Sequence, residues 1–144
     1  MKTHFALLLS FSMLAVGGCN LLAPETGYVP QVAPPMADIP VPVGFDMEHD
    51  TSRDRSDGGL RWVDHRYSGK GPIAPLANFY EKQMPQYRWN LVTRGFARGA
   101  ATLDFEKARE RCRITISRKN SLLNTIQIHV DVWTHTIATS PATN

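Results

Sequence analysis

Residues 111–134 read RCRITISRKNSLLNTIQIHVDVWT, and this stretch decides the fold because apolar and polar residues alternate along it twice. The apolar positions are Cys112, Ile114 and Ile116, followed by Ile126, Ile128, Val130 and Val132. Successive side chains of a β-strand point to opposite faces. We therefore predict strands at residues 111–117 and 124–134, each with one apolar face that another layer must cover.

An amphipathic helix over residues 73–86 is the candidate for that layer. Its apolar residues form one stripe at 3.6-residue spacing, comprising Ile73, Leu76, Ala77, Tyr80, Met84 and Tyr87. Pro75 is tolerated only in the first turn of a helix, where its missing N–H group has no intrahelical partner anyway. We expect the regular helix to begin near Pro75 and to end near Pro85.

Four further strands complete the predicted fold, at residues 44–51, 59–67, 88–94 and 101–106. A polar turn region, residues 52–58, separates the first two, and Asp57-Gly58-Gly59 is a strong turn signal. Leu103 and Phe105 should join the core. The prediction is an α+β two-layer sandwich: an antiparallel sheet of about six strands, in the order β-β-α-β-β-β-β, covered on one face by one helix.

The N-terminus has the layout of an export signal. Lys2 precedes an apolar run over residues 5–16, which is too short to remain as a membrane span, since that needs about 20 apolar residues. The segment then ends in Leu14-Ala15-Val16-Gly17-Gly18-Cys19, which resembles the lipobox of bacterial lipoproteins, with Val16 where that family most often has Leu. Cleavage after Gly17 or Gly18 without lipid attachment is the alternative.

The lipobox resemblance implies cleavage between Gly18 and Cys19, a diacylglyceryl group on the Cys19 thiol, and often an acyl chain such as palmitate on the new amine. Two or more acyl chains hold a protein stably on a membrane. The residue after Cys19 is Asn20 and not Asp. In this respect the chain resembles the lipoproteins of diderm bacteria that are passed to the outer membrane. The implied location is the cell envelope, with the domain facing the periplasm or the envelope surface.

The next segment, residues 19–42, is rich in proline. Proline fixes φ and lacks an N–H donor, so we expect residues 23–42, which hold the prolines, to form an extended tether of about 3.1 Å per residue, reaching roughly 60 Å. A proline-rich ligand for another protein is the alternative. The expected organisation is residues 1–18 as signal peptide, 19–42 as lipidated tether, 43–136 as globular domain and 137–144 as disordered tail.

A second resemblance concerns the domain itself. Residues 79–85 read FYEKQMP and are followed by Trp89-Asn90-Leu91, which resembles small uncharacterised lipoprotein domains and, more distantly, helix-grip domains of barrel-assembly lipoproteins. It covers roughly residues 39–136 and implies no activity.

The charge of the chain favours some partners over others. The formal net charge is +3, or +2 once Lys2 is removed, which is too small to indicate a nucleic-acid partner. Residues 65–119, however, hold twelve basic and four acidic residues. This half could face an anionic lipid or glycan, although charged residues on solvated strand faces are the commoner explanation.

Few residues suggest chemistry. Cys112 is flanked by Arg111 and Arg113, which could favour a thiolate, yet its alternation with isoleucines predicts a buried apolar role. His129, Asp131 and His135 could share one strand face, with Asp64 and His65 possible neighbours, but a solvated face is favoured over a metal site. The candidate partner contacts are Trp133, Tyr67, Arg111 and Arg113.

No catalytic motif is present, so we predict a non-catalytic, lipid-anchored envelope module that binds an envelope protein, anionic lipid or glycan, with no cofactor besides its lipid. The alternative is a small hydrolase or a thiol or metal enzyme that uses Cys112 or the His129, Asp131 and His135 face. Residues 1–144 do not indicate an oligomeric state.

Overall fold

A computed structural model describes residues 27–135 and confirms the α+β two-layer architecture. In chain order the elements are β1 (Phe45–Met47), β2 (Arg53–Asp57), β3 (Leu60–Lys70), α1 (Ile73–Gln83), the 3₁₀ helix η1 (Met84–Tyr87), β4 (Asn90–Ala97), β5 (Ala100–Lys107), β6 (Glu110–Asn120) and β7 (Thr125–Thr134). The signal peptide, Cys19 and the predicted tail at residues 137–144 lie outside the described residues.

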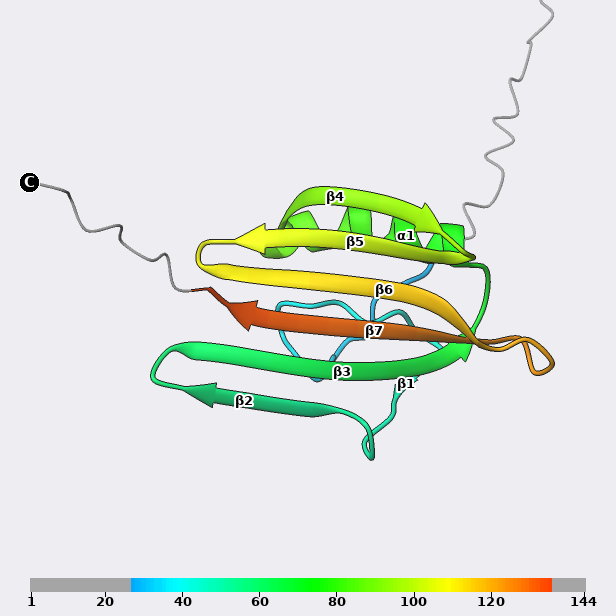
Figure 1. Ribbon diagram of the computed structural model, residues 1–144, viewed down its shortest axis with the longest axis horizontal. Helices are drawn as coiled ribbons and strands as arrows, with labels where there is room; N and C mark the ends of the chain where they lie inside the picture. The colour runs from blue at the N-terminus through cyan, green and yellow to red at the C-terminus, as the bar shows by residue number, and fades with distance from the viewer. Residues whose placement is uncertain (1–26, 136–144) are drawn as a thin grey trace, which may run out of the picture.

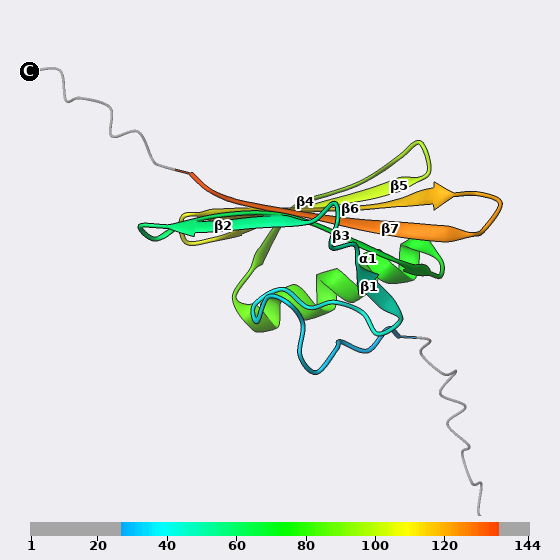
Figure 2. The same ribbon diagram turned by 90° about the horizontal axis from the view of Figure 1, so that it is seen from below.

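All strand pairs are antiparallel, and the sheet has the order β1-β3-β7-β6-β5-β4 (Figure 1). Strand β3 lies near one edge of the sheet and β4 forms the opposite edge. The chain between them, which includes α1, therefore crosses one face of the sheet. Figure 2 shows α1 and the N-terminal segment on one face of the sheet, while the opposite face is open. We call these the inner face and the outer face.

The core lies between the inner face and α1. The predicted helix stripe supplies Leu76, Ala77, Tyr80 and Met84, all fully buried. Opposite them, Cys112 and the alternating isoleucines and valines of β6 and β7 are at most 1% exposed, as are Leu103 and Phe105. The helix is shorter than predicted, because regular α-helix stops at Gln83 and residues 84–87 tighten into a 3₁₀ turn around Pro85.

A seventh strand was missed. Residues 53–57 were predicted as part of a polar turn, but they form β2, which pairs with β3 beside the short strand β1. All five residues of β2 are exposed, so no apolar alternation marks the strand. The Asp57-Gly58-Gly59 turn signal was right: Gly58 and Gly59 both have positive φ, 54° and 81°, as a tight hairpin turn between β2 and β3 requires.

The tether prediction is wrong for the residues closest to the domain. Met36 is 8% exposed, while Ile39 and Val41 are fully buried in the main core. Residues 29–43 form a closed loop, in which the Gln31 N–H donates to the Val41 carbonyl and the Val43 N–H to the Val29 carbonyl, both at 2.8 Å. The prolines excluded regular structure here, but they did not prevent the apolar residues between them from packing.

Candidate functional site

The outer face of the sheet is the candidate site, and strand register arranges its side chains in rows across the strands. One row, which we call the aromatic row, runs Arg55, Trp62, Trp133, Arg111 and Glu106. The adjacent row, which we call the charged row, runs Arg53, Asp64, Asp131, Arg113 and Asp104. Residues directly opposite on neighbouring strands interact, so each row is a connected surface.

Two tryptophans form the centre of the aromatic row. Trp62 is 47% exposed and Trp133 is 37% exposed, and the two are directly paired between β3 and β7. A surface hollow beside them is also lined by Arg55, Leu60 and Thr134. At the other end of the row, Arg111 is held by Glu106, with 2.9 Å between Nη1 and Oε2. A large, partly apolar patch is thus flanked by two guanidinium groups.

The sequence placed part of this surface correctly. Trp133, Arg111 and Arg113 lie on the outer face, as their alternation with the buried Cys112 and Val132 predicts. Trp62 was missed as a site residue, although its alternation with the inward-facing Val63 was a usable signal.

Tyr67 does not belong to this surface, and its prediction as a partner contact is wrong. Its side chain is 1% exposed and points into the core, where its hydroxyl lies 3.1 Å from His65 Nδ1. Burial raises the pKa of Tyr67 and lowers the pKa of His65. The strand continues three residues beyond Tyr67 to Lys70, so the tyrosine is not at a strand end.

The predicted histidine and aspartate cluster forms in part. His129 Nε2 lies 2.7 Å from Asp64 Oδ1 and 3.2 Å from Asp131 Oδ1. Burial, and secondarily the negative charge of Asp64, raises the pKa of Asp131. His135 is separate from this group and follows β7, where its N–H donates to the Arg109 carbonyl at 2.9 Å. His65 faces the core instead.

One atom from each of Asp64, His129 and Asp131 lies within 4.8 Å of the others, which is close enough to share a divalent ion. Arginines compete for the same carboxylates. Arg66 Nη2 lies 3.3 Å from Asp64 Oδ1. The positive charge of Arg113 acts to lower the pKa of Asp131. The cluster is thus both a possible set of ligands and a part of an ion-paired sheet face.

Cys112 lies on the inner face and is 1% exposed, as its alternation predicted. Burial raises the pKa of its thiol, so the flanking arginines, whose side chains lie on the outer face, do not produce a thiolate. This geometry gives no support to a cysteine nucleophile.

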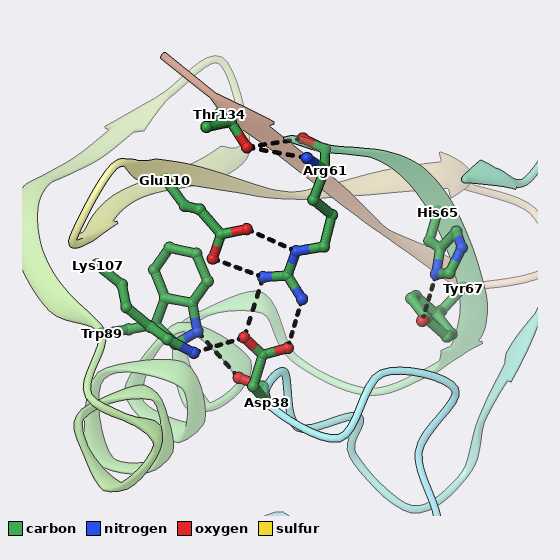
Figure 3. Close-up of polar contacts among 8 residues, drawn as sticks. All are labelled: Asp38, Arg61, His65, Tyr67, Trp89, Lys107, Glu110 and Thr134. Carbon is green, nitrogen blue, oxygen red and sulfur yellow. Dashed lines mark hydrogen bonds and ion pairs between the residues drawn. The ribbon is translucent and has the colours of Figure 1, made fainter. Parts of the chain in front are cut away.

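A second polar cluster, which the sequence did not predict, lies at the inner side of the sheet (Figure 3). The carboxylate of Asp38 accepts hydrogen bonds from both terminal nitrogens of Arg61, at 2.8 and 3.0 Å, and from Lys107 Nζ at 2.6 Å. Arg61 also donates to Glu110, and the Trp89 indole donates to the Asp38 carbonyl at 3.0 Å. We call these five residues the Asp38 cluster.

The Asp38 cluster joins the loop of residues 29–43, which we call the proline-rich loop, to strands β3 and β5. Burial by itself would raise the pKa of Asp38, but hydrogen bonds and charge from Arg61 and Lys107 outweigh it and lower the pKa to about 2. The carboxylate is therefore ionised throughout the physiological range. Sequence reasoning missed the cluster because Asp38 and Lys107 are 69 residues apart.

No protein-family model, curated protein or solved structure matches this chain. Within residues 27–135, none of the helices has the length and apolar character needed to cross a membrane.

Proposed function

We propose that this chain is a non-catalytic, lipid-anchored module of the bacterial envelope, which binds another envelope component through the outer face of its sheet. The observation that carries the proposal is the lipobox at residues 16–19, which follows an apolar run too short to span a membrane. Asn20 favours the outer membrane as the final location, with the domain in the periplasm or at the envelope surface.

A lipid on Cys19 would hold the folded domain close to the membrane. The described chain starts at Gly27, eight residues after Cys19. Eight residues span at most about 28 Å when fully extended. Because residues 29–43 pack on the domain, the lipid would hold the body much nearer the bilayer than a free tether of residues 19–42 would.

The aromatic row supports a binding role. Tryptophan and arginine are the residue types that most often dominate the free energy of protein interfaces, and here two of each lie in one row across four strands. The side chains of this row and of the charged row present indole rings, guanidinium groups and carboxylates. Such a surface suits an envelope protein or an anionic glycan.

The anchor is tested by fractionating cells that express the Cys19→Ser variant. After a high-salt wash, which removes proteins held by charge alone, the parent protein should still sediment with membranes and the variant should not. Cys112→Ala, which removes the other cysteine, should behave as the parent. A Cys19→Ser protein that distributes as the parent does would contradict the proposal.

The binding surface is tested with a photo-reactive amino acid introduced at position 133 in cells. We expect a defined adduct from position 133, and its loss when Trp62→Ala is added. Gln86, which is exposed beside the helix and away from the outer face, is the matched control position and should give no adduct. Equal labelling from both positions would contradict a specific surface.

The close approach of Asp64, His129 and Asp131 favours one alternative, a metal-dependent hydrolase. Equilibrium dialysis of the purified protein against Zn²⁺ distinguishes the two functions. Stoichiometric binding that is lost in His129→Gln would favour the enzyme, and the binding module predicts no such difference.

A further inference from the structure

The loop between β6 and β7, residues 121–124, exposes two adjacent leucines. Leu122 is 94% exposed and Leu123 is 66% exposed. Apolar side chains grouped at the tip of a hairpin commonly mark contact with a protein or a membrane. Their position on the molecule indicates which of the two they meet.

The loop is built to present these side chains. The Asn120 carboxamide oxygen accepts hydrogen bonds from the backbone N–H groups of Leu122 and Leu123, at 2.9 and 3.1 Å. Arg118 in turn donates to the side chain of Asn124 at 3.1 Å. Two backbone donors at the tip are therefore already satisfied, which lowers the cost of moving the leucines out of water.

The leucine loop lies at the same end of the molecule as the first described residues. Tyr28 packs so closely on Gly71 that a Cβ there would lie 1.7 Å from its hydroxyl. Gly71 follows Lys70, which is paired with Thr125, the first residue after the loop. Figures 1 and 2 agree, since the blue start of the described chain and the β6–β7 loop lie towards the same end of the long axis.

Exposed cations surround this end of the sheet. Strands β3, β4 and β6 all run towards it, and they place Lys70, Arg98 and Arg118 there, each exposed. Asp46 in β1 and Glu48, which follows β1, are nearby acidic residues, and Glu48 is paired with Lys119. Basic residues next to exposed apolar side chains favour an anionic lipid surface.

We infer that the β6–β7 loop is a membrane contact: Leu122 and Leu123 enter the headgroup region of an anionic bilayer, and Lys70, Arg98 and Arg118 meet its phosphates. The inference rests on the proposed function, since the lipid on Cys19 would hold this end within about 28 Å of the same bilayer. The aromatic row, near the opposite end of β3 and β7, is then turned away from the membrane.

Fluorescence of the mature, lipidated protein in vesicles tests this contact. Ser121→Cys places an environment-sensitive dye in the loop, and Ser56→Cys places it at the opposite end of the molecule, in β2. Cys112 is buried and Cys19 would carry lipid, so the dye reacts at the new cysteine alone. On vesicles of phosphatidylcholine and phosphatidylglycerol, the dye at position 121 should shift to the blue and the dye at position 56 should not.

Two further variants test whether the leucines themselves enter the bilayer or the loop merely lies near it. The double change Leu122→Ser and Leu123→Ser should abolish the blue shift, whereas Leu60→Ser, which alters a leucine 55% exposed at the opposite end, should preserve it. Vesicles of phosphatidylcholine alone should give a smaller shift, because the cations then lack an anionic partner.

Several results would overturn the inference. They are a position-121 dye that stays in water on vesicles, a shift equal at positions 121 and 56, or a concentration-dependent shift without vesicles, which would indicate self-association. Mass spectrometry of the same preparation shows whether Cys19 carries lipid, and so tests the proposed function independently. If the protein proves unlipidated, the proposed function fails, and a shift at position 121 on vesicles still supports the loop contact while its absence overturns it.

Discussion

Asp38 shows at the residue scale how one carboxylate holds a proline-rich loop against a sheet. Asp38→Asn removes the charge that Arg61 and Lys107 surround, so we expect the free energy of unfolding at pH 7 to fall by about 1–3 kcal/mol. Urea unfolding measures this. Asp57→Asn is the control, since the Arg55–Asp57 pair is more than three-quarters exposed and should contribute less than about 1 kcal/mol.

The pH dependence of this contribution follows from the pKa of Asp38, which is lowered from 3.8 to about 2. A carboxyl whose pKa is lower in the folded state stabilises the fold above its unfolded pKa. That stabilisation is lost as the pH falls from about 4 to 2. The difference between parent and Asp38→Asn should therefore shrink across this window, and a difference independent of pH would contradict the account.

Cys112 gives the second prediction at this scale. A thiol reagent should leave the native protein unmodified and should react once the protein is unfolded in denaturant, because the side chain is 1% exposed. Cys112→Ser should lower the free energy of unfolding by about 1–3 kcal/mol, since it places a hydroxyl in an apolar site. Rapid modification of the native protein would contradict the buried position and revive the thiol enzyme.

At the scale of elements, the loop formed by residues 29–43 behaves as part of the core. Ile39→Ala should lower the free energy of unfolding by about 2–5 kcal/mol, because Ile39 is fully buried. Val32→Ala is the matched control: the side chain is fully exposed and lies in the same loop, so the midpoint of urea unfolding should hardly change. Equal effects of the two changes would mean that the loop does not pack on the sheet.

Elements with an apolar stripe were predictable, and those without one were not. Strands β6 and β7 and helix α1 each alternate or repeat at the spacing of their buried face, so local sequence was sufficient. Strand β2 has no buried face and exists through its pairing with β3. The proline-rich loop was misjudged because Ile39 and Val41 pack through tertiary contacts that local propensity does not contain.

The candidate site divides in the same way. Alternation predicted the outward position of Trp133, Arg111 and Arg113, because side-chain direction is a local property of a strand. The neighbours of these residues depend on register between strands far apart in the chain. The pairing of Trp62 with Trp133, and of Asp64 with Asp131, was therefore visible only in the folded sheet.

At the scale of the whole molecule, the long axis separates two kinds of surface. One end carries the first described residues and the β6–β7 loop (Figure 1), and with them the exposed leucines and cations. The two tryptophans of the aromatic row lie near the other end, where β3 starts and β7 ends. A lipid anchor at Cys19 would direct the first of these ends towards the bilayer. The outer face near the other end would then be free to bind a partner.

Mass spectrometry of the mature N-terminal peptide, prepared from the membrane fraction of the native host, tests the lipid anchor most directly. The account predicts a chain that begins at Cys19 and carries the added mass of a diacylglyceryl group, with or without a further acyl chain. A chain cleaved elsewhere, or one that begins at Cys19 with an unmodified thiol, would contradict it.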